Sequence, residues 1–240
     1  MPPNNNTKNN GVKNGIANNE TKEITWTVDI NYNQLELDNA KLIDEIAENQ
    51  SLVDGSVKIS ETTINGDGDI IIGNDVTGNF TDKIRTNNNL VEIDFGPIHQ
   101  SYRVEFATID KDGIYNSDEV YENTAQFIPR KGEEHNLYAN VTLPNQGEFL
   151  GKKGLHNKED WTIDWTIDVN KSKSKLTNVT VKDNLGEGQI LLEDTIKVKK
   201  AGSHDELEKG TDYTLYVKGN TLSITFQDEI TDAYEITYSS

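Results

Sequence analysis

The stretch KNGIANNETKEITWTVDIN, residues 13–31, decides the fold, because a near copy, KKGLHNKEDWTIDWTIDVN, occupies residues 152–170. One offset of 139 residues (152 − 13) carries the whole of 13–59 onto 152–198 without a gap. Several residue types recur at matching places in the two copies: Gly15 and Gly154, Trp26 and Trp165, Asp29 and Asp168, Asn31 and Asn170. An internal repeat of this length predicts two homologous domains.

Within each copy, apolar and polar residues alternate with a period of two. In the first copy the apolar set is Ile24, Trp26, Val28 and Ile30, and the same alternation returns at 102–106 and 234–238. This pattern is typical of half-buried β-strands, and Asn-Gly and Asp-Gly pairs between them mark turns. Many short strands at regular spacing predict an all-β protein of two tandem immunoglobulin-like antiparallel β-sandwich domains.

The repeat also sets the predicted domain boundaries. Residues 1–12, MPPNNNTKNNGV, are rich in asparagine and are predicted to be a disordered tail. The first sandwich is then expected at 13–130, a polar linker at 131–150, and the second sandwich at 151–240.

Composition narrows the classes of function. The chain has 240 residues, a net charge of −18 and no cysteine. The negative charge argues against nucleic acid or an anionic membrane as partner, and thiolate metal sites and disulfides are excluded. No apolar run is long enough to insert into a membrane, and the N-terminus has no apolar signal sequence. If the protein is exported, we therefore expect this chain to be a piece of a longer one.

Three polar residues fall on faces that should be apolar. In NAKLIDEI, Asp44 shares its face with leucine and isoleucine, and Asp183 holds the same place in the second copy, NVTVKDNL. In VYENTAQF, Asn123 shares its face with Tyr121 and Phe127, on what is expected to be the last strand of the first domain. A buried carboxylate must be paired, hydrogen-bonded or protonated with a raised pKa. There are two plainer alternatives. Asp44 could accept hydrogen bonds from turn amides, and Asn123 could be an ordinary core asparagine whose hydrogen bonds are satisfied.

A lysine beside such residues has a specific chemistry. An amine in a dry pocket loses its proton and attacks the carboxamide carbon of an asparagine, while a buried carboxylic acid polarises the carbonyl and moves protons. Ammonia leaves and an isopeptide bond remains. The reaction occurs once and needs no cofactor.

At this point the sequence resembles a known family. ITWTVDINYNQLELDNAKLIDEI, LTNVTVKDNLGEGQ and YENTAQF are similar to the collagen-binding domains of MSCRAMM-type, cell-wall-anchored surface adhesins of Gram-positive bacteria. The resemblance implies a variant immunoglobulin sandwich, an extracellular protein attached to the cell wall through other parts of the protein, and isopeptide bonds. It implies that Lys13 is the nucleophile, Asp44 the catalytic acid and Asn123 the acceptor. Lys152 and Asp183 match the lysine and the acid in the second domain.

The second domain departs from this pattern at its end. Aligning Tyr102 with Tyr234 places Ser240 opposite Thr108, and the counterpart of Asn123 would lie fifteen residues further (123 − 108). We therefore expect the last strand to be missing, Lys152 to be unpaired and Asp183 to be unused. An open sheet edge there invites strand addition from another molecule. The plain alternative is a fragment that stops early.

Metal binding and catalysis find little support. Asp67 and Asp69 in NGDGD, and Asp110 and Asp112 in DKDGIYNSDE, are weak calcium candidates, and ordinary hairpin turns are favoured for both loops. The four histidines are scattered, and no Ser/His/Asp grouping or phosphate loop occurs. We expect no cofactor, no metal and no enzyme activity beyond the single autocatalytic cross-link.

Three functions remain open. The first is an adhesin, expected to be a monomer, that binds an extracellular-matrix protein such as collagen. The second is a structural stalk with no ligand of its own. The third is a calcium-dependent surface module.

Overall fold

The computed structural model describes residues 5–240, which divide into two compact domains. Domain 1 contains the described residues up to Lys111 together with Val120–Leu143. Domain 2 contains Asp112–Glu119 and Pro144–Ser240. Within the described residues, no helix has the length and apolarity that crossing a membrane requires.

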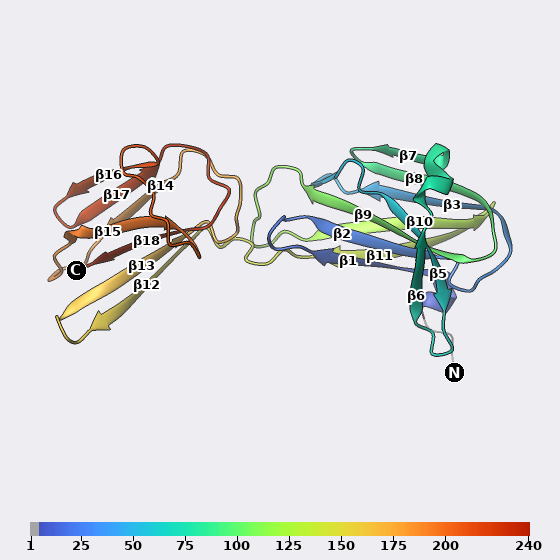
Figure 1. Ribbon diagram of the computed structural model, residues 1–240, viewed down its shortest axis with the longest axis horizontal. Helices are drawn as coiled ribbons and strands as arrows, with labels where there is room; N and C mark the ends of the chain where they lie inside the picture. Colours follow the sequence, from blue (N-terminus) through green and yellow to red (C-terminus); the bar gives the residue numbers. More distant parts are fainter. Residues whose placement is uncertain (1–4) are drawn as a thin grey trace. The chain divides into compact units, whose positions relative to one another are not determined.

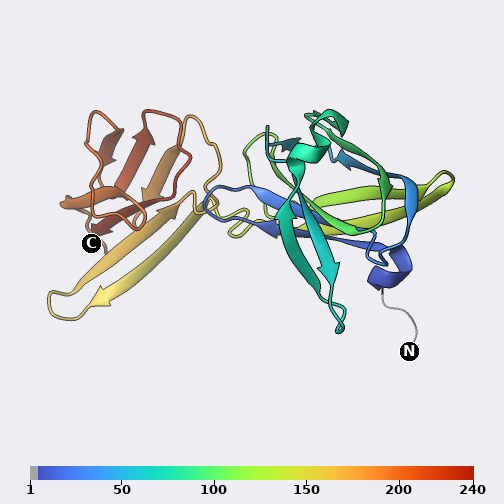
Figure 2. The ribbon, with the colours of Figure 1, turned by 45° about the vertical axis from the view of Figure 1, so that its right-hand side comes forward.

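The first sheet of domain 1 has the strand order β1-β2-β9-β5-β6, and β4 also pairs with β9 (Figure 1). A short helix, α1, precedes it. The bounds are α1 Asn5–Asn9, β1 Gly11–Ala17, β2 Ile24–Ile30, β4 Gln50–Leu52, β5 Lys58–Ile64, β6 Ile70–Asp75 and β9 Ser101–Asp110. The β5–β6 hairpin extends beyond the rest of domain 1 (Figure 2).

The second sheet of domain 1 has the order β11-β10-β3-β8-β7, with every pairing antiparallel. A 3₁₀ helix, η1, lies between β6 and β7. The bounds are β3 Leu37–Ile46, η1 Thr77–Lys83, β7 Ile84–Asn87, β8 Leu90–Ile98, β10 Tyr121–Arg130 and β11 Glu133–Val141.

The core of domain 1 lies between these two sheets. Alternate residues of the central strands point inward, as the period of two predicts. On β2, Ile24, Trp26, Val28 and Ile30 are all fully buried. On β3 the buried residues include Ala40, Leu42, Asp44 and Ile46, and on β10 they include Tyr121, Asn123, Ala125 and Phe127. The prediction that an aspartate and an asparagine face the core is confirmed.

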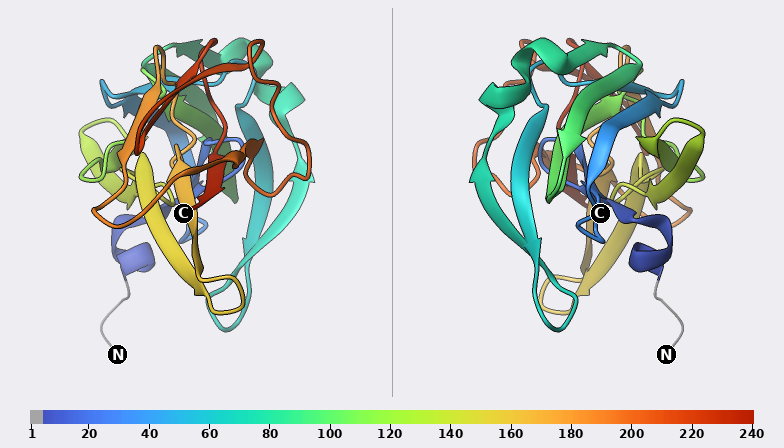
Figure 3. Two further views of the ribbon diagram at one scale, coloured as in Figure 1. Left: turned by 90° about the vertical axis from the view of Figure 1, so that its left-hand side faces the viewer. Right: turned by 90° about the vertical axis from the view of Figure 1, so that its right-hand side faces the viewer.

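Domain 2 repeats this plan with fewer strands. Its first sheet has the order β12-β13-β18-β15, and its second has the order β14-β17-β16. The bounds are β12 Leu150–Asn157, β13 Thr162–Val169, β14 Thr180–Asn184, β15 Leu192–Lys200, β16 Tyr213–Lys218, β17 Thr221–Phe226 and β18 Tyr234–Ser239. In the left view of Figure 3 the β12–β13 hairpin lies toward the reader, with β12 at the sheet edge.

The repeat predicted from the sequence holds at the level of strand register. Lys13 lies opposite Val28, and Lys152 lies opposite Ile167, which is the same pairing shifted by 139. Asn31 and Asn170 both follow the tryptophan strand with a left-handed backbone, at φ 52° and 54°. Each asparagine amide also closes its own turn, by donating to a carbonyl four residues later. The two domains are therefore structural copies as well as sequence copies.

Three details of the predicted boundaries are wrong. Residues 5–12, expected to be disordered, form α1 and the start of β1; residues 1–4 lie outside the described part of the chain. Residues 131–143 of the predicted linker, 131–150, belong to domain 1, and Glu133–Val141 among them form strand β11. The strand that carries Asn123 is consequently not the last of its domain. The polar alternation of β11 conceals it, because only its inward side is apolar.

Candidate functional site

Strand β1 places Lys13 inside domain 1. Its side chain has no exposed surface, and neither has that of Asp44. The glycine two residues later explains how the strand fits: a Cβ on Gly15 would come within 2.5 Å of the Trp26 ring and of Val141. Gly15 therefore lets the indole lie across β1, and the indole covers the lysine. Gly154 has the same relation to Trp165, at 2.8 Å.

Asp44 and Asn123 come from neighbouring strands of the second sheet. In the register of β3 and β10, Asp44 lies opposite Ala125, and Asn123 lies opposite Ile46. Asn123 and Ala125 are two positions apart on β10, so the carboxamide and the carboxyl share the inward face. The predicted lysine, acid and asparagine thus meet in one core, from three strands and both sheets.

The electrostatics of this core favour neutral side chains. Lys13 Nζ contacts Asp44 Oδ2 directly. Burial lowers the pKa of the Lys13 amine, although the Asp44 carboxylate opposes that shift. Burial also raises the pKa of the Asp44 carboxyl, against the opposing effects of Lys13 and, more weakly, of the nearby Asn123 carboxamide. Removing a charge from water penalises both ions, so each shift favours the neutral form of its group.

Orphaned polar atoms gather at the same place. Across residues 5–240, the buried side-chain nitrogen and oxygen atoms without a hydrogen-bond partner are Asp44 Oδ1, Asn123 Nδ2 and Asn123 Oδ1. A buried polar group left without a partner costs about 1–3 kcal/mol. Such groups are uncommon in folded proteins and call for an explanation. The carboxamide and one oxygen of the acid are therefore the unsatisfied part of this core.

Aromatic rings complete the walls around the amine. Lys13 Nζ lies 5.5 Å from the ring centre of Trp26 and 5.0 Å from that of Phe106. Both aromatic side chains are almost completely buried. They exclude water from the amine, which is the condition under which a lysine loses its proton at neutral pH.

A hydrogen-bond chain fixes the strand that carries Asn123. The Trp26 indole N–H donates to Thr108 Oγ1 at 2.8 Å, and the Thr108 hydroxyl donates to Gln50 Oε1 at 2.7 Å. The Gln50 amide then donates to the carbonyl of Glu122 at 2.9 Å, next to Asn123. The sequence interpretation did not assign these residues to the site. The recurrence of Gln50 as Gln189 in the repeat was the available signal.

Domain 2 carries part of the same arrangement. Lys152 Nζ lies 2.6 Å from Asp183 Oδ2 and 4.2 Å from the ring centre of Trp165. Tyr238 stands where domain 1 has Phe106, and its hydroxyl donates to Asp183 Oδ2. Burial and the neighbouring carboxylate raise the pKa of Tyr238, which keeps it a donor. Among the described residues, no strand pairs with β14 on the side where β10 pairs with β3.

The calcium candidates have other roles in the structure. Asp67 and Asp69 lie in the turn of the β5–β6 hairpin, where both backbone amides donate to Asn65 Oδ1. Asp110 accepts a hydrogen bond from the Tyr121 hydroxyl at 2.9 Å. Asp112 lies in the segment that belongs to domain 2. Over residues 5–240, no three acidic, histidine or cysteine side chains gather in a way that suits a metal ion.

Comparisons with known proteins agree with this architecture. The family model of the collagen binding domain matches residues 8–136 and 147–240. A comparison with curated protein sequences returned no significant match.

Solved structures of similar domains come from several bacteria. The collagen-binding subdomain of Enterococcus faecalis surface protein ACE is 14% identical, with a TM-score of 0.41, over 55% of this chain and 96% of that one. The collagen-binding domain of a Staphylococcus aureus adhesin is 18% identical, with a TM-score of 0.39, over 56% and 96%. That of Erysipelothrix rhusiopathiae surface protein RspB is 12% identical, with a TM-score of 0.35, over 93% and 76%.

Proposed function

The chain belongs to the collagen-binding domain family, and from this premise we propose that it is a bacterial surface-adhesin module that binds collagen. We further propose that domain 1 is closed by an isopeptide bond between Lys13 and Asn123. The observation that carries the second proposal is the set of orphaned buried atoms on Asp44 and Asn123, beside an amine that burial drives toward neutrality.

The residues have distinct roles in the proposed reaction. The Lys13 amine attacks Cγ of Asn123, and a new C–N bond forms. Protonated Asp44 donates to Asn123 Oδ1, which stabilises the charge that develops on that oxygen. The carboxyl then moves a proton from Lys13 Nζ to the departing nitrogen, and the old C–N bond breaks. Ammonia leaves, no electrons are transferred, and no cofactor is required.

The bond would change how domain 1 unfolds. It joins β1 to β10 and closes a loop of about 110 residues (123 − 13), which by analogy with a disulfide restricts the unfolded chain by about 4–5 kcal/mol. Tension on a surface protein would then pass through a covalent link and not through the hydrogen bonds between strands. A self-cross-linked sandwich suits a protein that must hold its ligand under flow.

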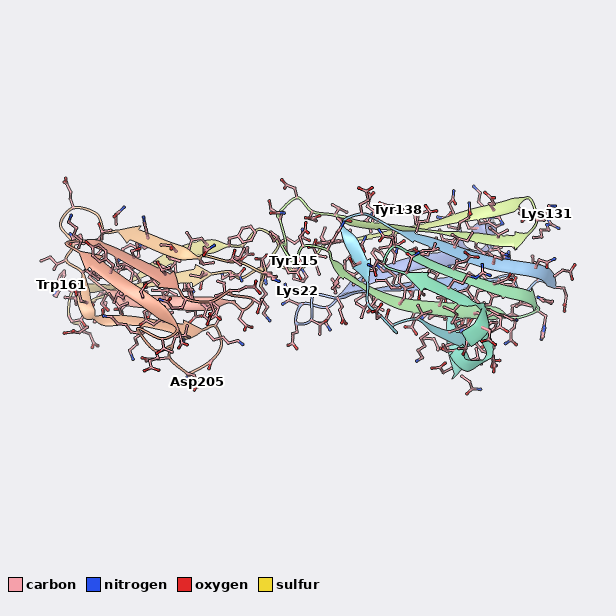
Figure 4. All side chains as sticks on the ribbon, turned by 90° about the horizontal axis from the view of Figure 1, so that it is seen from above. Lys22, Tyr115, Lys131, Tyr138, Trp161 and Asp205 are labelled. Atoms are coloured by element: carbon pink, nitrogen blue, oxygen red, sulfur yellow. The ribbon has the colours of Figure 1, made fainter. Side chains whose placement is uncertain are left out.

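For collagen we propose the outer face of the second sheet of domain 1. A hollow of about 280 Å³ lies there, lined by Ile43, Glu45, Thr124, Gln126 and Asn136. Tyr138 on the neighbouring strand is half exposed and lies on the outside of domain 1 (Figure 4). Amide and hydroxyl groups suit the exposed carbonyl groups of a triple helix, and an exposed tyrosine is a common anchor for a protein ligand.

Binding of a triple-helical Gly-Pro-Hyp peptide, measured by biolayer interferometry, tests this proposal. The heat-melted peptide serves as the ligand control. Thr124→Arg fills the hollow and should weaken binding roughly tenfold or more, equivalent to about 1.4 kcal/mol. Thr86→Arg, at an exposed position on β7, should bind as the unmodified chain does. If the chain binds no triple helix of any sequence, the adhesin role is contradicted and the stalk role replaces it.

Location and reactivity follow from the same proposal. We propose an extracellular protein displayed on the bacterial surface, where it meets matrix proteins. We also propose that it is not an enzyme, because each lysine is consumed by the bond it makes. The cross-link alone suits a stalk as well as an adhesin, so the collagen assay decides between them.

A further inference from the structure

A hollow in domain 2 lies against a pair of aromatic rings. Its volume is about 220 Å³, and its apolar and aromatic lining consists of Leu207, Phe226, Ile230 and Tyr234. Phe226 and Ile230 are buried, and the ring centres of Phe226 and Tyr234 lie 5.0 Å apart. Pockets that hold a drug-sized ligand measure about 300–1,000 Å³. This smaller hollow therefore suits a single side chain.

In domain 1 a third ring covers the corresponding place. Tyr102 and Tyr234 hold the same register against the tryptophan strands β2 and β13. Phe95 and Phe226 lie on the matching strands β8 and β17. The ring centre of Phe80, in η1, lies 5.1 Å from that of Phe95 and 5.6 Å from that of Tyr102. Phe80 is only 7% exposed, so its ring closes this place in domain 1.

A different connection leaves the place open in domain 2. Residues 201–212, AGSHDELEKGTD, join β15 to β16 and contain no phenylalanine, tyrosine or tryptophan. Leu207 is the apolar residue that this loop contributes to the hollow, and its amide donates to the Val198 carbonyl at 2.8 Å. The loop is thus fixed to β15 without supplying a ring. The hollow is therefore a difference between the two copies, located where η1 has no equivalent.

The polar part of the lining is mainly acidic. It consists of one lysine and four carboxylic acids: Lys200, Asp212, Asp228, Glu229 and Asp232. Lys200 Nζ lies 2.6 Å from Asp232 Oδ2, and Lys175 Nζ lies 3.6 Å from Glu229 Oε2. These two acids therefore already have a cation beside them, and the other two do not.

The two remaining carboxylates give the hollow its net negative charge. Across residues 5–240, neither Asp212 nor Asp228 forms an ion pair. Asp212 Oδ2 accepts a hydrogen bond from the Glu208 amide at 2.7 Å, which fixes that carboxylate and leaves its other oxygen for a ligand. Burial raises the pKa of the Tyr234 hydroxyl, and the Asp232 and Asp212 carboxylates raise it further against an opposing lysine. The ring and the acids thus face the same space.

We propose that this hollow binds an arginine side chain of a protein partner. The aliphatic stem would lie on Leu207 and Ile230, and the planar guanidinium would lie against the Tyr234 ring. Its N–H groups would donate to Asp212 and Asp228. A lysine fits less well, because its ammonium is compact, strongly hydrated and unable to stack. A metal ion is disfavoured, since no three acidic side chains of the described residues converge as a metal site requires.

The experiment titrates the 240-residue chain with the peptide acetyl-Gly-Arg-Gly-amide and follows proton–nitrogen NMR spectra. We expect saturable shifts at the amides of Phe226 and Tyr234, with a millimolar Kd because one side chain buries little area. The same peptide with citrulline has the shape of arginine without its charge, and it should bind roughly tenfold more weakly or not at all. Equal shifts with citrulline, or shifts confined to other residues, would overturn the proposal.

Matched variants locate the site. Asp212→Asn combined with Asp228→Asn keeps the side-chain volumes and removes both charges, so it should weaken arginine binding roughly tenfold. Asp194→Asn, an exposed acid at the other end of β15, should leave the Kd unchanged. Leu207→Phe places a ring in the loop, as η1 does in domain 1, and should abolish binding while the melting temperature is kept or raised. Arginine binding that survives Leu207→Phe in a folded chain would refute the hollow as the site.

Two further ligands separate this site from its alternatives. Calcium chloride that causes the same shifts and displaces the peptide would replace the arginine site with a metal site. The triple-helical Gly-Pro-Hyp peptide contains no arginine, so its binding to domain 1 is tested independently. A chain that binds the triple helix but not the arginine peptide would refute this inference and leave the proposed function standing.

Discussion

Replacing Asn123 with alanine removes the proposed acceptor while leaving its neighbours intact. Lys13 and Asp44 still contact each other in the variant, so no buried charge loses its partner. Neither polar atom of the Asn123 side chain makes a well-formed hydrogen bond, and Asn123 has the smallest of the effects on the pKa of the Asp44 carboxyl, so truncation removes little other than the acceptor. The main consequence is therefore that domain 1 cannot form its cross-link.

The size of the effect follows from the loop that the bond closes. About 110 residues separate the linked positions, which corresponds to about 4–5 kcal/mol of restricted unfolded-chain entropy. With a urea m-value of about 2 kcal/mol per molar, the unfolding midpoint of domain 1 should fall by roughly 2 M. A surface substitution changes stability by about 0.5 kcal/mol or less, so the difference is easily resolved.

Urea titration followed by tryptophan fluorescence measures this shift in domain 1 alone. Trp26 is fully buried in that domain, and the other two tryptophans, Trp161 and Trp165, lie in domain 2. Phenylalanine at both domain 2 positions makes Trp26 the only reporter. The two domains then need not unfold together for the analysis to hold.

Two matched variants complete this experiment. Asn140→Ala, at an exposed position on β11, should leave the midpoint unchanged. Asn123→Asp keeps a carbonyl carbon for attack, so it should restore the bond with loss of one water and recover most of the stability. If Asn123→Ala unfolds at the same urea concentration as the unmodified chain, although that chain carries the bond, the loop-closure argument is refuted.

Three further predictions test the surroundings of the bond. Lys13→Met removes the cross-link at every pH and also leaves Asp44 buried without its cation. Because the folded pKa of the Asp44 carboxyl lies above the unfolded value of about 3.9, this second destabilisation is absent below about pH 4 and grows as the pH rises, which urea titrations at pH 4 and pH 7 measure against Asn123→Ala. Asp44→Ala should fold with unchanged circular dichroism but keep its full mass, and a mass deficit there would show that the acid is dispensable. Gln50→Ala removes the partner of Thr108 and of the Glu122 carbonyl, so it should cost about 1–3 kcal/mol in domain 1 and slow bond formation in freshly refolded protein, followed by mass against time.

The sequence predicts the candidate site well because two independent signals agree there. The period of two places Asp44 and Asn123 on inward faces, and both are buried in the structure. The repeat selects Lys13, which has no informative pattern around it. Its identity as a buried residue depends on the glycine and tryptophan that recur with it at the same spacing. The reaction itself stays a prediction.

Sequence analysis does not find the domain boundaries that depend on contacts between residues far apart in the chain. Asn10 orders the beginning of the chain by accepting a hydrogen bond from the backbone amide of Asn33, 23 residues away. The segment 112–119 follows a domain 1 strand, yet it belongs to domain 2, where the Tyr115 amide donates to Ser174 Oγ at 2.9 Å. Local alternation carries no information about partners so far along the chain.

Strand β11 shows a second reason why prediction from the sequence fails. In EEHNLYANV the inward residues include Leu137 and Val141, but the other side is polar and the strand lies at a sheet edge. Such a strand has the composition of a linker, and its covering role over β1 appears only in three dimensions. The hydrogen-bond chain through Gln50 and Thr108 is hidden for the same reason, since 58 residues separate its two members.

The intact mass of the purified chain tests the central claim most directly, with Lys13→Ala measured beside it. We predict that the unmodified chain lies one ammonia below its sequence mass, that the variant does not, and that tandem mass spectrometry finds Lys13 joined to Asn123. A full sequence mass in the unmodified chain would contradict the cross-link and the roles of Lys13, Asp44 and Asn123.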